Sequence, residues 1–192
     1  MPSVSLQVWK TVRRIALDEM EAAHRSVGGT GPGRRYATQQ INQAYAVLLS
    51  SQFQGFCRDF HSECVNYFVQ SVPAGLLQTA LRSVLVDQLR LKTGNPNPGN
   101  IGHDYNRFGL AFWDEVKNLD IRNQARRDQL DELNIWRNAI AHQDFDPAKL
   151  GGTTVLRLQQ VRKWRHACDQ LANAFEEVMR SHLHAVNGIS PW

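Results

Sequence analysis

The residues best suited to chemistry lie together at positions 136–142, whose sequence is Trp-Arg-Asn-Ala-Ile-Ala-His. On a helical wheel drawn at about 100° per residue, Arg137 points almost into the middle of an apolar stripe, where a cation is unexpected. Asn138 and His142 share a neighbouring face, roughly 100 to 140° from Arg137. Arginine binds phosphate or carboxylate well, and imidazole exchanges protons near neutral pH. The three side chains could therefore border one cleft. The stripe consists of Leu130, Leu133, Ile140 and Ala141, with Trp136 at its edge.

Most familiar enzyme classes are excluded by motifs that the sequence lacks. It contains no glycine-rich phosphate loop, no HExxH, no GxSxG and no paired cysteines for zinc. Cys57, Cys64 and Cys168 occur at helical spacings among apolar residues, as buried and reduced thiols do. We therefore expect no metal, no other cofactor and a reducing compartment.

Charge and hydropathy indicate the class of protein. The 192 residues carry a net charge of +4, and arginine outnumbers lysine, which suits phosphate partners. The first thirty residues lack the apolar core of a signal peptide, and no window approaches the ~20 apolar residues of a membrane span. We expect a cytoplasmic protein that does not enter the membrane. The basic residues that could face a nucleic acid are Arg122, Arg126, Arg127, Arg157, Arg162, Lys163 and Arg165.

Helical periodicity recurs along the whole chain. Residues 1–33 are expected to form a helix and a glycine-rich linker packed on the bundle, and residues 34–192 one helical domain. Within that domain, residues 37–70 predict the longest helix, with an aromatic stripe flanked by an acidic edge that includes Asp59 and Glu63. Further helices are expected around residues 73–89, 104–116 and 123–142, before a long closing helix. The sequence therefore predicts an all-α bundle.

Residues 137–142, RNAIAH, resemble the R-x4-6-H signature of HEPN domains, in its frequent RNxxAH form. HEPN domains are α-helical domains named for higher eukaryote and prokaryote nucleotide binding. The placement is also similar, because a long core helix with a polar edge at residues 52–60 comes first and the signature precedes a final long helix. The resemblance covers residues 37–186, with the first helix as an extension.

This resemblance implies a metal-independent endoribonuclease, commonly a toxin or antiviral defence effector, whose active site is composed across a homodimer. His142 would take the proton of the ribose 2′-hydroxyl, and Arg137 would stabilise charge on the scissile phosphate. Asn138 would orient phosphate or imidazole, and Glu63 or Asp59 would hold the arginine in place. RNA would be the substrate, and a cognate antitoxin or regulatory protein a partner.

One position departs from the family pattern. HEPN toxins that are paired with nucleotidyltransferase antitoxins often carry a tyrosine two residues after the histidine, where this chain has Asp144. Control by nucleotidylation is therefore not expected. Asp144 could instead hydrogen-bond His142 and raise its basicity, or it could be an ordinary helix-end residue.

Three hypotheses follow from the sequence. The chain is a HEPN-type ribonuclease, a catalytically inactive HEPN-like module that binds nucleotide, RNA or protein, or an unrelated helical scaffold in which Arg137 is buried against an acid such as Glu63. A ribonuclease predicts both motifs of a dimer in one cleft. A scaffold predicts an internal ion pair of Arg137.

Overall fold

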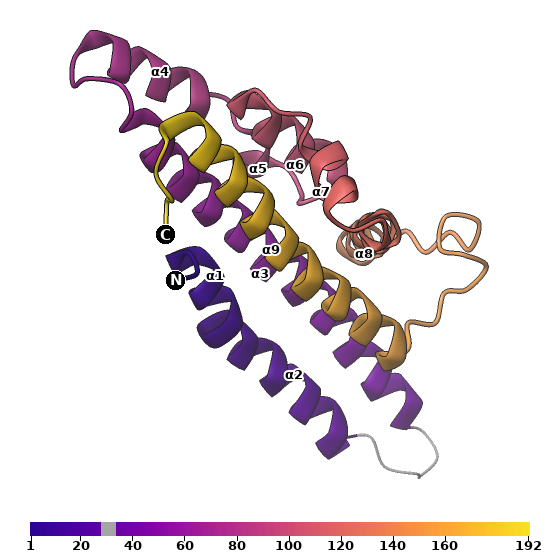
Figure 1. The fold of residues 1–192 in the computed structure, drawn as a ribbon. Helices are drawn as coiled ribbons and strands as arrows, with labels where there is room; N and C mark the ends of the chain where they lie inside the picture. The colour runs from indigo at the N-terminus through magenta and orange to yellow at the C-terminus, as the bar shows by residue number, and fades with distance from the viewer. Residues whose placement is uncertain (28–33) are drawn as a thin grey trace.

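A computed structural model describes residues 1–27 and 34–192, and every regular element in these ranges is a helix (Figure 1). This confirms the all-α prediction; the linker at residues 28–33 lies outside the described residues. No described helix is long and apolar enough to span a membrane. The elements are α1 (Val4–Val8), the π-helix η1 (Trp9–Arg13), α2 (Arg14–Val27), α3 (Arg34–Val69), α4 (Leu76–Val86), α5 (Arg90–Thr93), α6 (Pro98–Tyr105), the 3-10 helix η2 (Asn106–Phe108), α7 (Phe112–Leu119), α8 (Arg122–His142) and α9 (Leu158–Asn187).

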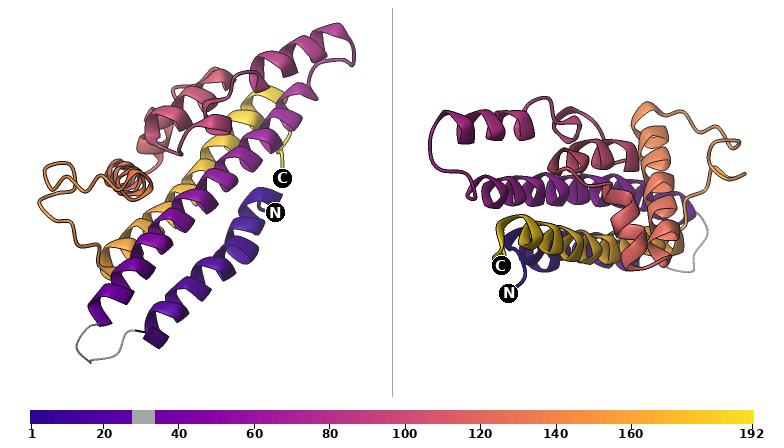
Figure 2. Two further views of the ribbon diagram at one scale, coloured as in Figure 1. Left: turned by 180° about the vertical axis from the view of Figure 1, so that it is seen from behind. Right: turned by 45° about the horizontal axis from the view of Figure 1, so that its top comes forward.

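Helices α3 and α9 run side by side and form the centre of the molecule (Figure 2). The aromatic stripe of α3 is buried at Phe53, Phe56 and Phe60, as predicted, whereas Tyr67 toward its end is half-buried. The three phenylalanine rings follow one another at 5.8 and 5.6 Å between centroids. From α9, Phe175 packs on Phe53 at 6.0 Å. Each buried ring contributes about 1.5–3 kcal/mol, so these two long helices hold most of the core.

The N-terminal segment α1–η1–α2 packs along α3 and α9 on one side of the molecule (Figure 1). Its buried apolar residues are Leu6, Trp9 and Leu17, and all three belong to the main core. Arg13 lies on the same face and bonds to α3, where its guanidinium donates to Gln52 and Asp59. Residues 1–27 are therefore a structural part of the bundle.

The remaining helices cover the opposite side of the α3–α9 pair. Helix α8 packs on both α9 and α3, while α5, α6 and α7 fill the space beside it (Figure 2). Helix α4 extends beyond the end of the bundle, which leaves Leu77 and Val84 exposed although their spacing in residues 73–89 predicts burial. Leu85, on the side of α4 that meets the core, is buried.

A buried histidine makes the stability of this core depend on pH. His61 on α3 is 1% exposed; its Nε2 lies 3.2 Å from the carbonyl oxygen of Asp104, and its Nδ1 has no partner. Burial lowers the pKa of His61 from 6.5 to about 4. Because the unfolded chain binds this proton more readily, the stabilisation is present above pH 6.5 and is lost as the pH falls toward 4.

We expect the free energy of unfolding to fall by about 2 kcal/mol more in the wild type than in His61→Gln between pH 7.5 and pH 5. The glutamine keeps a hydrogen-bond donor for Asp104 and does not titrate. Urea unfolding at the two pH values measures this difference. The exposed His184 supplies the control, because His184→Gln should follow the wild type. Equal pH dependence in His61→Gln and wild type would contradict the assignment.

Candidate active site

The motif at residues 137–142 occupies the last two turns of α8. The helix ends at Gln143, which adopts a left-handed conformation with φ of 55°, and the N–H of Asp144 donates to the carbonyl oxygen of Ala139 at 3.0 Å. This bond satisfies one of the final carbonyl groups and directs the chain away from the bundle. His142 is therefore held at the terminus of a well-packed helix.

The predicted apolar stripe of α8 is buried for most of its length. Leu130, Leu133 and Trp136 are buried, whereas Ile140 is half-buried. Ala141 is exposed, so the prediction that it belongs to the packed stripe is wrong: burial ends before the last residues of the helix. Arg137 is half-buried at this transition.

Arg137 has no carboxylate partner among the residues that the structure describes. Its only recorded hydrogen bond goes from Nη1 to Oδ1 of the adjacent Asn138, at 3.2 Å. Both Asn138 and His142 are exposed, and no hydrogen bond is recorded for the ring of His142 within the described ranges. A half-buried guanidinium without a counter-charge is suited to an anionic ligand, since such a ligand would supply charge-assisted hydrogen bonds.

The turn at residues 94–97 supports the motif, and its role was missed by sequence analysis. Nδ2 of Asn95 donates to Oδ1 of Asn138 at 2.5 Å. The buried Asn134 of α8 donates to the carbonyl oxygen of Pro96 at 3.1 Å, and Gln54 of α3 donates to that of Gly94 at 2.7 Å. Asn138 is thus oriented through a polar connection that reaches α3. Residues 95–98, Asn-Pro-Asn-Pro, are typical of a turn, but nothing local to them indicates that this turn lies beside α8.

Glu63 and Asp59 do not hold Arg137 in this chain, contrary to prediction. The carboxylate of Glu63 accepts hydrogen bonds from the backbone N–H groups of Val4 and Ser5 at 2.8 and 2.9 Å. Asp59 pairs with Arg13 at 2.6 Å. The acidic edge of α3 therefore faces the N-terminal segment and not α8. The scaffold hypothesis loses its proposed Arg137–Glu63 pair for the same reason.

Asp144 is not hydrogen-bonded to His142 either. Its carboxylate lies 3.4 Å from Nζ of Lys149, and its backbone completes the end of α8. The structure thus favours the interpretation of Asp144 as a helix-end residue over the predicted bond to the imidazole. The reason is local: the left-handed Gln143 turns the chain between the two residues.

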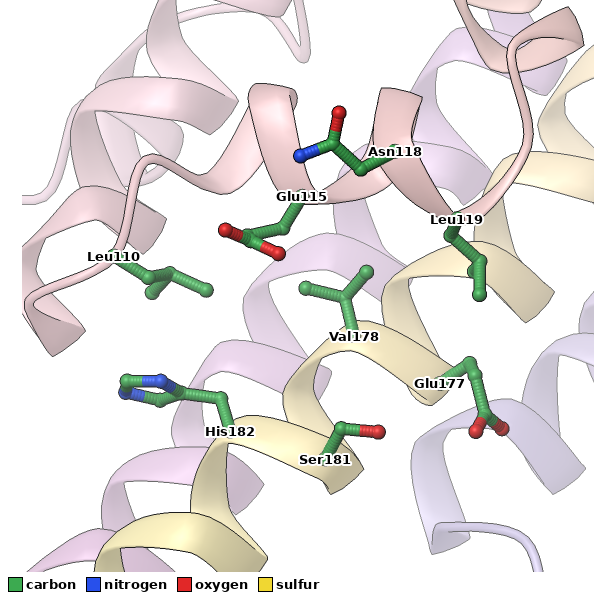
Figure 3. A pocket seen from close by; sticks show the side chains of 8 residues that line it. All are labelled: Leu110, Glu115, Asn118, Leu119, Glu177, Val178, Ser181 and His182. Atoms are coloured by element: carbon green, nitrogen blue, oxygen red, sulfur yellow. The ribbon is translucent and has the colours of Figure 1, made fainter.

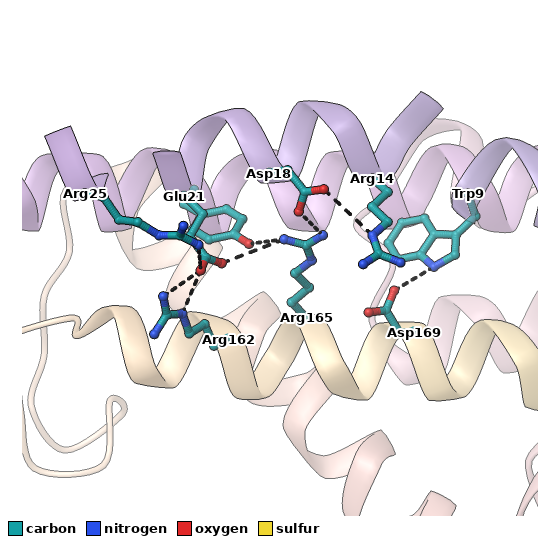
Figure 4. A network of polar contacts seen from close by, with 9 residues as sticks. Trp9, Arg14, Asp18, Glu21, Arg25, Arg162, Arg165 and Asp169 are labelled. Carbon is teal, nitrogen blue, oxygen red and sulfur yellow. Dashed lines mark hydrogen bonds and ion pairs between the residues drawn. The ribbon is translucent and has the colours of Figure 1, made fainter. Parts of the chain in front are cut away.

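Two predicted RNA-binding arginines are neutralised by the N-terminal segment (Figure 4). Arg162 pairs with Glu21 at 2.6 Å, and Arg165 pairs with Asp18 at 2.6 Å. Arg165 also donates to the hydroxyl of Tyr45 at 3.0 Å. Both guanidinium groups are thus already paired with carboxylates of α2, which reduces the positive charge that this face of α9 offers to RNA.

Two further arginines that were predicted to face RNA, Arg126 and Arg127, lie toward the far end of α8. Arg126 bonds to Asp120 at 3.0 Å, and the guanidinium of Arg127 lies 5.0 Å from the ring centre of Trp113. Arg126 precedes Arg137 by eleven residues, which is about 16 Å along a helix. The structure thus places Arg137, Asn138 and His142 at one end of α8, where Arg137 contacts Asn138, and it places the predicted supporting residues elsewhere.

A hollow of about 410 Å³ lies between α7 and α9 (Figure 3). In this hollow, Nε2 of His182 is hydrogen-bonded to the carbonyl oxygen of Phe108 at 2.9 Å. The carboxylates of Glu115 and Glu177 line this hollow and would repel an anion. It is lined by Leu110, Glu115, Asn118, Leu119, Glu177, Val178, Ser181 and His182.

The end of α8 therefore presents a cation, an amide and an imidazole within six residues. This set can bind a phosphate, orient it and exchange a proton beside it. In comparisons with protein-family models, curated proteins and solved structures, the chain matches none of them.

Proposed function

We propose that the protein is a metal-independent endoribonuclease of the HEPN type, which cleaves RNA through attack by the ribose 2′-hydroxyl. The proposal rests on the surroundings of Arg137. This side chain is half-buried, and no carboxylate among the described residues pairs with it. The exposed His142 lies at the same end of the helix. A buried cation normally requires a counter-charge. An RNA phosphate would supply it.

The proposed reaction needs one proton acceptor, one proton donor and a cation. His142 removes the proton from the 2′-hydroxyl, and the resulting oxygen attacks the adjacent phosphorus. Arg137 stabilises the negative charge that accumulates on the phosphate oxygens. The bond to the 5′-oxygen then breaks, and that oxygen takes a proton from a second, protonated imidazole. The products are a 2′,3′-cyclic phosphate and a 5′-hydroxyl.

We propose a homodimer as the active form, in which the second imidazole is His142 of the other copy. On the helical wheel, Arg137 lies roughly 100 to 140° from Asn138 and His142, and its guanidinium reaches back to Asn138 at 3.2 Å, so a second copy would be needed to bring a second imidazole to the phosphate. Ile135 is 40% exposed and precedes Asn138 and His142 by three and seven residues, which places it on their face of α8. This exposed isoleucine supports a contact with a second copy.

In the cell, such an activity would be that of a cytoplasmic toxin or antiviral defence effector. A cognate antitoxin or regulatory protein would restrain it. The exposed Asp144 after the motif leaves no tyrosine there to be nucleotidylated, which favours restraint by binding over covalent modification.

The test is incubation of the protein with a mixture of tRNA and mRNA in EDTA, followed by analysis of the product ends. We expect cleavage that leaves 2′,3′-cyclic phosphates. The double variant Arg137→Ala/His142→Ala, purified in parallel, controls for contaminating ribonucleases and should leave the RNA intact. Sedimentation of the wild type should give the mass of a dimer. Intact RNA with the wild type would overturn the proposal, and retained RNA binding would then indicate an inactive binding module.

A further inference from the structure

Three cations without acidic partners lie on α5 and at the end of α4. Arg90 and Lys92 belong to α5, and both are exposed. Arg107 belongs to η2 and is half-buried. No ion pair is recorded for these three side chains within the described part of the chain, whereas Arg162 and Arg165 are paired with carboxylates of α2. The three cations are called the α5 surface below.

A short turn connects the α5 surface to the motif. Nδ2 of Asn95 donates to Oδ1 of Asn138 at 2.5 Å, and the same oxygen accepts from Arg137 at 3.2 Å. Lys92 precedes Asn95 by three residues, which span at most about 11 Å. An RNA strand whose scissile phosphate lies at Arg137 would therefore bring neighbouring phosphates within reach of α5 if it left the motif across this turn.

Hydrogen bonds to α6 and α3 fix α5 in this position. The buried carboxylate of Asp104 accepts from the backbone N–H groups of Arg90 and Leu91 at 3.0 and 2.9 Å. From α3, the side chain of Gln54 donates to the carbonyl oxygens of Leu91 and Gly94 at 2.9 and 2.7 Å. The backbone that bears the two exposed cations is thus held on two sides. Asp104 is fully buried, so its carboxylate does not face a ligand on this surface.

Lys92 and Arg107 both bind carbonyl groups at the end of α4. Nζ of Lys92 donates to the carbonyl oxygen of Val86, and Nη1 of Arg107 donates to that of Val84, each at 3.0 Å. The carbonyl end of a helix carries only about half a unit of negative charge, so two cations there leave an excess of positive charge. Asp87 is exposed nearby, but its carboxylate accepts a hydrogen bond within α4 and forms no recorded ion pair in the described structure. A phosphate would supply the missing negative charge.

An acidic residue disfavours a path for the strand along α8. Asp131 is exposed and precedes Asn138 by seven residues, or about two turns, so the two residues share a face of the helix. A strand that followed this face would pass the carboxylate of Asp131 and be repelled by it. The path across the turn at residues 94–97 meets the cations of the α5 surface instead.

We propose that the α5 surface binds phosphates of the RNA strand on one side of the scissile phosphate and so positions the strand at the motif. The inference rests on the proposed ribonuclease function for the identity of the ligand. Phosphate contacts fix the register of a strand without reading its sequence. They also make binding depend on salt, because each contact releases counterions from the RNA.

The test compares two double variants, each introduced into full-length His142→Ala so that binding is measured without cleavage. Arg90→Gln/Lys92→Gln removes two charges from the α5 surface. Lys10→Gln/Arg14→Gln is the matched control, because it removes two exposed charges from the N-terminal segment, on the opposite side of the α3–α9 pair. The probes are a labelled dodecanucleotide of uridine and a trinucleotide, which is too short to reach beyond the motif.

We expect Arg90→Gln/Lys92→Gln to bind the dodecanucleotide about ten- to thirtyfold more weakly at about 0.1 M salt. The slope of log affinity against log salt concentration should decrease in magnitude by about 1.4, because each phosphate contact of a single strand contributes about 0.7. The single variant Lys92→Gln should show about half of this decrease. The control should stay within about twofold of its parent, and the trinucleotide should bind equally to all of the variants.

The results separate this proposal from the ribonuclease proposal. Circular dichroism should show that the variants are folded, since the replaced side chains are exposed. Equal affinity of the two double variants for the dodecanucleotide, or no binding by their parent, overturns the α5 surface even if the wild type cleaves RNA. A loss confined to the variants of α5 supports it even if the wild type leaves RNA intact, in which case only the catalytic assignment fails.

Discussion

Replacement of His142 by alanine is expected to slow RNA cleavage by about 10²- to 10⁴-fold, the range that one general acid or base contributes. In the proposed dimer both copies lose their imidazole, so neither the 2′-hydroxyl nor the leaving oxygen exchanges its proton with the protein. His142 is exposed and bears no recorded hydrogen bond in the described structure, so its loss should not disturb the fold. Single-turnover rates on a defined RNA measure the effect.

The control for this variant is His166→Ala. His166 is an exposed histidine on α9, outside the motif, and its replacement should leave the cleavage rate within a factor of two or so. Circular dichroism and thermal unfolding should show that both variants are folded. If His142→Ala retained a rate within about threefold of the wild type, the imidazole would not be the general base.

Replacement of Trp9 by alanine is expected to lower the free energy of unfolding by about 3–5 kcal/mol, the cost of deleting a large buried aromatic side chain. Trp9 is 2% exposed, and its ring centre lies 5.6 Å from that of Phe53 and 5.7 Å from that of Phe56. Its indole N–H also donates to Asp169 at 3.0 Å. Burial raises the pKa of Asp169, and the bond from Trp9 opposes that rise. The variant thus loses packing and leaves a partly buried carboxylate without its donor.

Two further substitutions identify the source of this effect. Trp9→Phe keeps a ring in the core and removes the N–H, so its cost should be only about 1–2 kcal/mol. Val12→Ala, at a position of the same segment that is 65% exposed, should change stability by less than about 0.5 kcal/mol. Urea unfolding measures all three. A loss below 1 kcal/mol or so in Trp9→Ala would show that the N-terminal segment is an accessory and not part of the core.

Local periodicity predicted much of the core of this molecule, although it also predicted burial of Leu77, Val84 and Ala141, which are exposed. The spacing of Phe53, Phe56 and Phe60 determines which face of α3 is buried, because a helix fixes the directions of its own side chains. The same argument placed Leu130 and Leu133 against the bundle. The end of α8 was also predictable, since the residues after His142 favour a turn and Pro147 forbids an immediate continuation.

The partners of the charged side chains were not predictable in this way. Glu63 and Arg165 look like solvent-facing residues on the wheels of their own helices, and their bonds depend on where the N-terminal segment docks. That docking is fixed by contacts between residues 39 to 173 positions apart. The burial of Asn42 was not predictable for the same reason. It arises from the chain around Leu156, whose carbonyl oxygen accepts a hydrogen bond from the side chain of Asn42.

The two ends of the N-terminal segment are held by different kinds of contact. At its start, apolar contacts of Trp9 and hydrogen bonds to Glu63 hold it, whereas its last turns are held by the ion pairs of Glu21 (Figure 4). Salt weakens ion pairs at a surface far more than it weakens apolar contacts. Increasing ionic strength should therefore loosen the segment from its α2 end, while the end at Trp9 stays in place. Attachment of the α2 end thus depends on the salt concentration, whereas attachment of the Trp9 end does not.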